Sequence, residues 1–496
     1  MEPRRYTVPC VVLPVAAAGR EGGSVSSEIP WRRRAAVAVT VVALSLVIAP
    51  SVPARRRNEH APNKPNIVWI VTDDQRWDTL WSMPTVQSDL VARGVTFTNG
   101  FVVNPLCCPS RASILTGEYS HSTGVYSDGP PHGGFASFRD ASTVATWLHG
   151  AGYQTAMMGK YLNGYPPQRR YLPPGWDEWA AFDGPARQPG FGYEYYNYFL
   201  NINHSLHPFG YQPNDYSTGV LANRAITFID NATGPFFLYL APAAPHSPVI
   251  PPPGDEHAFS DLSRWRPPSY NERNVSDKPN WLRSLPRLNH HQRATLDRFR
   301  KNQYRTLLGV DQAVGEIVNA LAQTGRLDQT MIVLTSDNGY QWGEHRINGK
   351  NVPYEESIRV PFVVRYDPLV ATSRSDPSLV LNIDLAPTAA ALAGTTAPGA
   401  EGRSLLPLLS SPGLPWRRDF LVEHLLGGSA PTFCQLRTKR YSYVAYGGKH
   451  QELYDLAADP FELRNVARVR ALDSTRVALR NRLKHLCRPR PPGYKF

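Results

Sequence analysis

Acidic and amide side chains stand directly after two apolar runs of the sequence. Asp73 and Asp74 follow the first run, and the second run, much later in the chain, is followed by Asp337 and Asn338. If both runs are parallel strands, their carboxyl ends meet at one edge of a sheet, so the two pairs can converge. Three carboxylates and an amide oxygen form a ligand set that suits calcium or magnesium and not zinc. An Asp-Asp pair alone is equally consistent with a helix cap or a turn.

The adjacent Cys107 and Cys108 need a separate explanation. One interpretation is a disulfide partner or a metal-binding pair of thiols. Neighbouring cysteines rarely bond to each other comfortably, and the sequence has no Cys-x-x-Cys or His cluster to complete a structural zinc site. The two cysteines open the segment CCPSRASILTG, which spans residues 107–117. This segment is specific enough to decide the question.

CCPSRASILTG resembles the signature of the sulfatase family, in which Cys-x-Pro-Ser-Arg is followed by an aliphatic residue and Thr-Gly. The resemblance implies that a formylglycine-generating enzyme oxidises Cys107 to formylglycine. The hydrated aldehyde has two hydroxyls on one carbon: one attacks sulfur, and the other expels sulfate and restores the aldehyde. The resemblance also implies a calcium ion, and it places the metal ligands at Asp73, Asp74, Cys107, Asp337 and Asn338.

The residues after Pro109 predict the beginning of a helix. Cys107 would then lie near a positive helix terminus, which favours anions. Arg111 is expected to hold the diol and to offer fixed hydrogen-bond donors to developing charge. A hard cation at this point would neutralise the sulfate oxygens and lower the pKa of the diol.

Three further residues match positions of the family: Lys160 in GKYLNGY, His246 in APHSP and Lys350 in INGKNVPYEESIRVP. The resemblance implies that the two lysines bind the sulfate oxygens and that His246 protonates the leaving alcohol. Taken alone, a lysine is usually a solvated charge, and a single histidine more often has a structural role.

The sequence departs from the family in one place. Many sulfatases have Lys-x-His where this chain continues from Lys160 to Asn163, so the histidine often assigned to sulfate elimination is missing. Asn163 cannot act as a base, although it could donate a hydrogen bond. His121 is an alternative base, but a structural role for it is the favoured interpretation.

The periodicity of the chain predicts an α/β fold. Short apolar runs predict buried strands at 66–72, 153–158, 235–241, 330–336 and 360–366. Helical spacing is found at 84–93, 142–151, 217–230, 300–323 and 383–394. This alternation indicates a large, mostly parallel sheet sandwiched by helices, as in the alkaline phosphatase superfamily to which sulfatases belong. Segments 166–215 and 248–298 are expected to be long loops that recognise the substrate.

From about residue 414 the sequence changes to short polar strands and turns, which predict a smaller antiparallel sheet and a closing helix near 468–486. We therefore expect four parts: an N-terminal extension and signal peptide at 1–54, a linker at 55–64, a catalytic domain at 65–413 and a C-terminal subdomain at 414–496.

The N-terminal segment predicts export to the cell surface or the medium. Arginines at 32–34 precede the apolar run 35–49 and small residues at 50–54, which is the order of a secretory signal peptide. The run is shorter than the roughly 20 residues of a membrane span, so no stable span is expected. An uncleaved membrane anchor is the alternative. Export permits disulfides, and Cys434 and Cys487 are expected to pair rather than to remain two buried thiols.

The chain of 496 residues carries a formal charge of +12. Such a charge suits an anionic partner, although a solvated basic surface is an equal alternative. No nucleic-acid motif is present, so nucleic acid is not expected as a partner. The stretches GKYLNGY, LPPGWDEW and YYNYFLNIN resemble those of N-acetylglucosamine-6-sulfatases and extracellular heparan 6-O-endosulfatases. This implies a sulfated sugar partner, with the 6-O-sulfate of N-acetylglucosamine or glucosamine in glycosaminoglycan-type sugars as the substrate.

Three alternatives remain. The first is an arylsulfatase of broad specificity. The second is a phosphodiesterase or phosphonate monoester hydrolase, because such enzymes share the fold and can share formylglycine. The third is a sugar-binding protein that has kept the fold without catalysis, since fold alone does not fix function.

Overall fold

The computed structural model describes residues 64–165, 170–183, 195–427, 430–448 and 450–496. The expected signal peptide, and all but the last residue of the expected linker, lie outside this range. Among the helices of the described residues, none combines the length and the hydropathy that crossing a bilayer requires.

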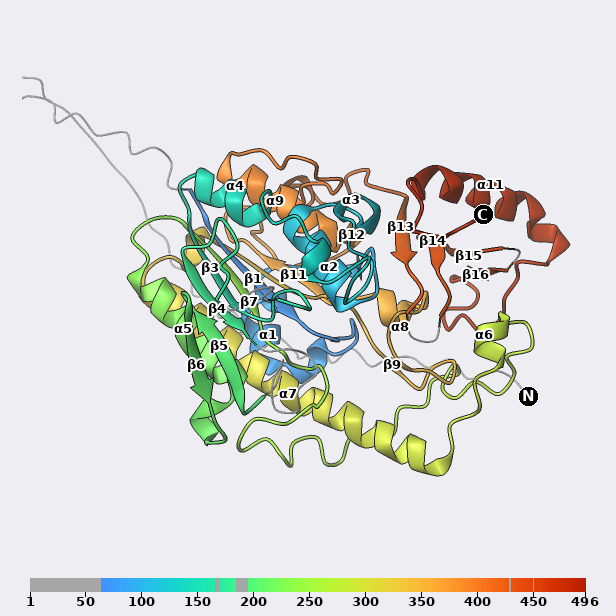
Figure 1. Ribbon diagram of the computed structural model, residues 1–496, viewed down its shortest axis with the longest axis horizontal. Coiled ribbons are helices and arrows are strands. Elements are labelled where there is room, and N and C mark those ends of the chain that lie inside the picture. Colours follow the sequence, from blue (N-terminus) through green and yellow to red (C-terminus); the bar gives the residue numbers. More distant parts are fainter. Residues whose placement is uncertain (1–63, 166–169, 184–194, 428–429, 449) are drawn as a thin grey trace, which may run out of the picture. The chain divides into compact units, whose positions relative to one another are not determined.

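Ten strands form one mixed sheet (Figure 1). They are β1 (Asn66–Thr72), β2 (Val95–Phe101), β3 (Gln154–Gly159), β4 (Glu178–Phe182), β5 (Tyr198–Ile202), β6 (Ser205–Phe209), β7 (Phe236–Ala241), β8 (Thr330–Ser336), β11 (Phe362–Arg365) and β12 (Arg374–Leu381). Their order is β12-β2-β11-β8-β1-β7-β3-β4-β5-β6. The central strands β8, β1, β7, β3 and β4 are parallel, which confirms the predicted core of the fold. A two-stranded sheet, β9 (Gln341–Trp342) with β10 (Asn348–Gly349), lies apart from it.

Helices cover both faces of the large sheet (Figure 1). Within the described residues before 419, the α-helices are α1 (Pro84–Asp89), α2 (Cys107–Thr116), α3 (Ser120–Thr123), α4 (Val144–Gly150), α5 (Ser217–Asn231), α6 (Asn280–Arg283), α7 (His290–Gln323), α8 (Glu355–Ile358), α9 (Leu385–Ala393) and α10 (Leu406–Ser410). Successive side chains of β1 point to opposite faces: Trp69 packs with residues of α2, α4 and α9, whereas Ile70 packs with residues of α1, α5 and α7. A strand buried on both faces explains the continuous apolar run in the sequence.

Three expectations about the elements are wrong in part. The strand expected at 360–366 forms as β11, but it is antiparallel to both of its neighbours. Segment 166–215 is not only loop, because it contributes β4, β5 and β6 to the edge of the sheet. The helix expected at 300–323 begins at His290, within the second expected loop. The missed signal was a capping box, in which the Asn289 side chain accepts a hydrogen bond from the Gln292 N–H at 2.9 Å.

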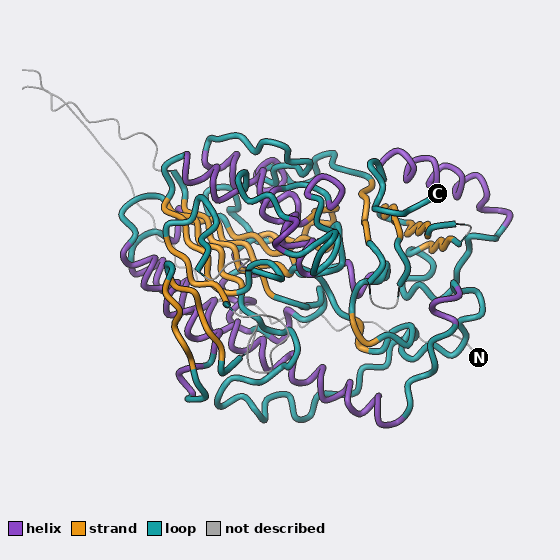
Figure 2. Tube along the Cα trace, in the orientation of Figure 1, coloured by secondary structure: helices purple, strands orange, loops and turns teal. Residues whose placement is uncertain are grey.

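The C-terminal region contains a second, antiparallel sheet. Its strands are β13 (Asp419–His424), β14 (Phe433–Thr438), β15 (Tyr441–Tyr446) and β16 (Gln451–Asp455), and it is followed by α11 (Asp473–Leu486). This confirms the expected antiparallel sheet and closing helix, which Figure 2 shows apart from the large sheet. The domain boundary at 413–414 stays a prediction.

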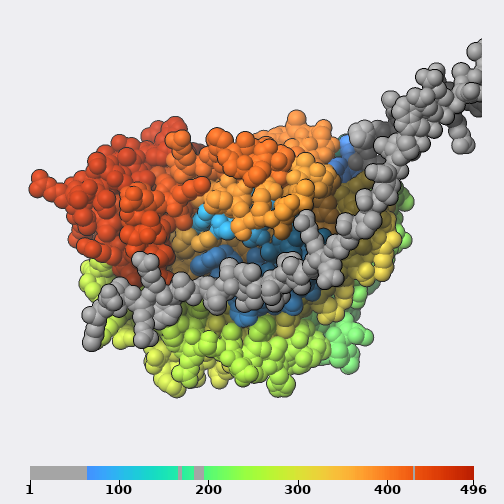
Figure 3. Space-filling view, turned by 180° about the vertical axis from the view of Figure 1, so that it is seen from behind, coloured from blue at the N-terminus to red at the C-terminus, as the bar shows by residue number. Residues whose placement is uncertain are grey.

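The second sheet packs against the main body of the protein. Figure 3 shows the C-terminal residues in red directly against segments coloured orange and yellow-green. Phe420 and Val422 of β13 share a buried cluster with Phe101 and Leu379 of the large sheet. The two sheets are therefore joined by a continuous apolar interface.

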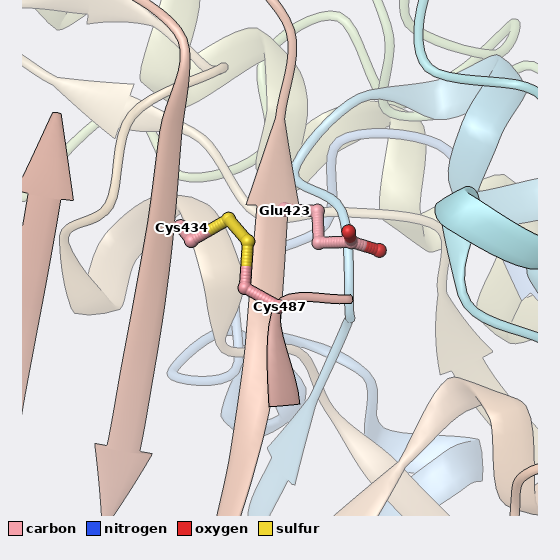
Figure 4. Close-up of side chains that lie close together, drawn as sticks. All are labelled: Glu423, Cys434 and Cys487. Carbon is pink, nitrogen blue, oxygen red and sulfur yellow. A yellow bond between two sulfur atoms is a disulfide. The ribbon is translucent and has the colours of Figure 1, made fainter. Parts of the chain in front are cut away.

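A disulfide joins Cys434 on β14 to Cys487 at the end of α11, as predicted (Figure 4). The two cysteines are 53 positions apart in the sequence, and their bond ties α11 to the second sheet. Cys107 and Cys108 are both buried free thiols. The adjacent cysteines are therefore not bonded to each other.

Candidate active site

The predicted metal ligands converge at the carboxyl ends of two neighbouring strands. β1 and β8 are parallel, with Thr72 opposite Ser336, so the residues that follow them leave the sheet side by side. The Asp74 N–H donates to Oδ1 of Asp337 at 3.3 Å, and Nδ2 of Asn338 donates to Oδ1 of Asp74 at 2.6 Å. The register of two strands thus brings together residues that are far apart in the sequence.

Cys107 is the first residue of α2 and points toward these carboxylates. Its Sγ and carboxylate oxygens of Asp73 and Asp337 all lie within 4.8 Å of one another. Pro109 lies in the first turn, where its missing N–H removes no helical hydrogen bond, and the helix ends at Gly117, whose φ of 74° is left-handed. Cys108 packs instead in the core beneath the helix. The two cysteines therefore have different surroundings.

Arg111 lies one helical turn after Cys107 and joins the parts of the site. Its Nε lies 2.7 Å from Oδ2 of Asp337, and its Nη2 lies 3.5 Å from Oδ2 of Asp73. Its Nη1 donates to the backbone oxygen of Lys160 at 2.8 Å. This buried guanidinium fixes the side chain positions of two carboxylates beside the helix terminus.

Two lysines complete the positive side of the site. Lys160, directly after β3, is hydrogen-bonded to the Asp73 carboxylate. Lys350 Nζ lies 2.6 Å from Oδ1 of Asp74 and 3.8 Å from Oδ1 of Asp73. Burial alone would raise the pKa of Asp73, but Lys160 and the neighbouring cations hold it well below its usual range.

The carboxylates retain capacity for a cation. Oδ1 of Asp73 is buried and has no hydrogen-bond partner among the described residues. Burial, followed by the charge of Asp73, raises the pKa of Asp337, as expected when acidic groups crowd together. The donor atoms are hard oxygens, which match calcium or magnesium. The residues present therefore fit a divalent cation of this class.

His246 lies at the solvent side of the site. Its Nε2 is 3.9 Å from Oδ2 of Asp74, and its side chain is 27% exposed. Its Nδ1 lies 2.6 Å from the backbone oxygen of Ser247, so the proton on this nitrogen is donated to that carbonyl. Nε2 is thus the nitrogen that can face a ligand entering the site.

His121 is held by two carboxylates. Its Nδ1 lies 2.9 Å from Oε2 of Glu423, and its Nε2 lies 3.3 Å from Oε1 of Glu401. Burial lowers the pKa of His121, but the hydrogen bonds to Glu401 and Glu423 raise it to about 10. Both ring nitrogens are engaged, which agrees with the structural role favoured above and not with a base for sulfate elimination.

Asp128 was missed in the sequence. Its Oδ1 lies 3.5 Å from Sγ of Cys107 and accepts a hydrogen bond from the Cys108 N–H at 3.3 Å. Oδ1 of Asn163 lies 3.6 Å from the same sulfur. Burial, followed by the charge of Asp128, raises the pKa of Cys107 to about 12. The Ser-Asp-Gly context of Asp128 is typical of a turn, so no sequence signal distinguished it.

Comparison with known proteins identifies the family. Residues 65–395 match the sulfatase family, a match that covers well over half of the chain. The chain belongs to the sulfatase family. Residues 343–488 of this sulfatase-family chain also match the C-terminal region of N-sulphoglucosamine sulphohydrolase. The family match thus agrees with the resemblance that the CCPSRASILTG segment indicated.

Several sulfatases are similar to this chain over most of its length. The human N-acetylglucosamine-6-sulfatase is 36% identical over 384 residues, which cover 73% of this chain and 67% of the human protein. The extracellular sulfatase SULF-1 homologue of Drosophila melanogaster is 36% identical over 388 residues, which cover 75% of this chain but 34% of the relative. A Caenorhabditis elegans homologue of this type is covered over 54% of its length. The chain thus spans about half of the length of the Caenorhabditis elegans relative and about a third of the length of the Drosophila relative.

Solved structures share the fold. One solved structure, determined in complex with its substrate D-glucosamine-2-N,6-O-disulfate, has a TM-score of 0.75 at 24% identity, and the match covers 86% of this chain and 98% of that chain. The phosphonate monoester hydrolase of Agrobacterium radiobacter has a TM-score of 0.68 at 21% identity. The match covers 85% of this chain and 95% of the hydrolase chain. At these identities the likeness supports the fold alone.

Proposed function

We propose that this protein is a sulfuric ester hydrolase that removes the 6-O-sulfate of N-acetylglucosamine or glucosamine in glycosaminoglycan-type sugars. The observation that carries the proposal is the position of Cys107 at the N-terminus of α2, with its sulfur within 4.8 Å of carboxylate oxygens of Asp73 and Asp337. A reactive side chain, a helix terminus and a set of hard ligands in one buried site suit an anionic ester.

Two groups complete the proposed site. The residues that would hold calcium are Asp73, Asp74, Asp337, Asn338 and the modified Cys107. Calcium bound there would supply positive charge that neutralises sulfate oxygens and lowers the pKa of the nucleophile. Oxidation of Cys107 by a formylglycine-generating enzyme would supply an aldehyde hydrate as that nucleophile.

We assign the remaining residues roles that their positions support. Lys160 and Lys350 carry ammonium groups beside the carboxylates, from which they can donate to the oxygens of an entering sulfate. Arg111 orients Asp337 and adds a fixed positive charge. His246 lies at the solvent side, and its Nε2 can face the ligand. It would give a proton to the leaving sugar oxygen from Nε2 when both ring nitrogens are protonated.

The substrate part of the proposal is supported by the relatives. One is named N-acetylglucosamine-6-sulfatase, and the solved relative was determined with a 6-O-sulfated glucosamine as its substrate. The net charge of +12 is compatible with a sulfated sugar chain as the partner. We also propose export through the N-terminal segment 1–54, because two relatives are named extracellular sulfatases.

Turnover of three esters at equal concentration tests the proposal. We expect kcat/KM to be highest for glucosamine-6-sulfate, compared with galactose-6-sulfate and a nitrophenyl sulfate. His246→Ala should slow the sugar sulfate more than the aryl sulfate, because a phenolate leaves readily without a proton. A wide margin in favour of the galactose or the aryl ester would exclude the glucosamine assignment. Faster turnover of the matched phosphate esters would exclude the sulfatase assignment itself.

A further inference from the structure

A second cluster of potential ligands lies between the loop that carries Lys350 and the C-terminal sheet. It consists of His345, which follows β9, Glu356 on α8, and Glu462, which follows β16. One ligand atom of each residue lies within 4.8 Å of those of the other two. The residues are 0%, 7% and 2% exposed, respectively, so water does not solvate the cluster freely.

Each member of the cluster has a buried polar atom without a hydrogen bond. Within the described part of the chain, Nε2 of His345, Oε2 of Glu356 and Oε1 of Glu462 have no partner. Buried polar atoms are nearly always satisfied, so three such atoms in one cluster indicate a group that binds them all. The other nitrogen of the ring, Nδ1, lies 2.7 Å from Oε2 of Glu272. A carboxylate in that position fixes the proton on Nδ1, so the lone pair of Nε2 is available to bind a metal.

The nearby cations are engaged elsewhere. Arg76 is paired with Glu344 at 2.7 Å, and Arg437 with Glu355 at 2.7 Å. Lys278 donates to the Tyr454 hydroxyl at 2.9 Å and to the backbone oxygen of Glu462. Among the described residues, no Lys, Arg or His nitrogen forms an ion pair with the carboxylate of Glu356 or Glu462. Two buried carboxylates without a paired cation must be neutralised by protons or by a metal ion.

The pKa shifts of the two glutamates and the backbone conformation of the cluster both support a bound, neutralising group. Burial, followed by the charge of Glu344, raises the pKa of Glu356 to about 8, and burial raises that of Glu462 well above its usual value. His345 and Glu462 both have a φ of 51°, a left-handed conformation that residues other than glycine rarely adopt. Such conformations concentrate at functional sites, where surrounding interactions hold them.

We propose that His345, Glu356 and Glu462 bind a divalent transition-metal ion of the zinc class, separate from the active-site cation. One imidazole nitrogen and two carboxylate oxygens suit zinc better than calcium, and three protein ligands leave a fourth position for water. His345 and Glu356 lie on either side of Lys350 in the sequence, and Glu462 belongs to the C-terminal region. The ion would therefore anchor the Lys350 loop to the second sheet.

Metal analysis of the purified full chain tests the proposal. We expect metal-free protein, resupplied with calcium, to take up one further equivalent of Zn²⁺, and its melting temperature to rise when Zn²⁺ binds. Co²⁺ in the same site should give the absorption bands of a nitrogen- and oxygen-ligated ion. Glu356→Gln and Glu462→Gln should each lose this equivalent and the thermal shift while keeping calcium.

Glu452→Gln is the matched control. Glu452 is a buried carboxylate of the same region, but the hydroxyls of Tyr354, Tyr446 and Tyr454 hold it outside the cluster. This variant should keep the Zn²⁺ equivalent even if its melting temperature falls. The proposal is overturned if the wild-type chain binds no additional Zn²⁺, or if both glutamine variants bind it as wild type does. In the first case the two carboxyl groups share a proton, and the melting temperature should fall as the pH rises from about 4.5 to about 8 and then level off, without any response to metal.

Discussion

Oδ1 of Asp128 lies 3.5 Å from Sγ of Cys107 and 3.3 Å from the backbone nitrogen of Cys108. One carboxylate oxygen thus contacts the proposed nucleophile and also satisfies an N–H group in the first turn of α2. Helix termini leave such N–H groups without an intrahelical partner. Asp128 is therefore a positioning residue for the start of α2.

Asp128→Ala should remove that acceptor and reduce activity. Leaving a buried N–H unsatisfied costs about 1–3 kcal/mol of stability. A shift of Cys107 at the start of α2 would misplace the nucleophile, so we expect kcat/KM to fall by up to about 100-fold. Asp128→Asn keeps an oxygen at the same position and should stay within about tenfold of wild type. If the asparagine variant is as poor as the alanine variant, the charge matters and not the acceptor. Steady-state kinetics of the two variants decide between these outcomes.

Cys107→Ala should abolish turnover while leaving the fold intact. Loss of a nucleophile commonly reduces kcat by a factor on the order of 10³ or more. Cys108→Ala should retain most of the activity, because Cys108 packs in the core and not in the site. The peptide that holds Cys107 should show the mass of the aldehyde in active wild-type protein. Full activity of Cys107→Ala would exclude the proposed mechanism.

Removal of divalent metal should abolish activity and lower the melting temperature. Asp73, Asp74 and Asp337 would then repel one another at close range in a buried site. Calcium added back to the chelated protein should restore activity and raise the melting temperature, and Zn²⁺ alone should not restore activity. Activity that returns with Zn²⁺ and not with calcium would contradict the calcium assignment.

His121 should make stability depend on pH. Its pKa in the folded state is about 10, above its ordinary value of 6.5, because Glu401 and Glu423 stabilise the imidazolium despite its burial. The stabilisation is therefore fully present below about pH 6.5 and is lost as the pH rises through about 10. The difference in melting temperature between wild type and His121→Asn should shrink over this interval. A difference that does not change with pH would show that the imidazolium contributes nothing.

The sequence predicted those parts of the fold that depend on local pattern. β1, β7 and β8 are apolar runs buried on both faces, and their period and length were sufficient to find them. β11 was found, but its direction was not, because strand direction depends on the connections and not on composition. β6 was missed because it is an exposed edge strand whose side chains lack the expected apolar pattern.

The residues of the site that belong to short sequence motifs could be predicted. Asp73 and Asp337 were placed together because both follow strands, and the strand register brings them to one edge. Asp128 could not be found, because its contact with Cys107 depends on how a turn folds over α2. The same limit applies to His345 and Glu462, whose proximity depends on the packing of two sheets.

The burial of Cys107 sets an order of events in the maturation of the chain. The residue is 2% exposed and is the first residue of a helix whose side chains are all buried. The enzyme that oxidises Cys107 could not reach its sulfur in the folded protein without unwinding that helix. On the proposed function, oxidation of Cys107 must therefore precede folding. Protein that folds first would stay inactive even when the modifying enzyme is supplied later, whereas production in the presence of that enzyme would yield active protein.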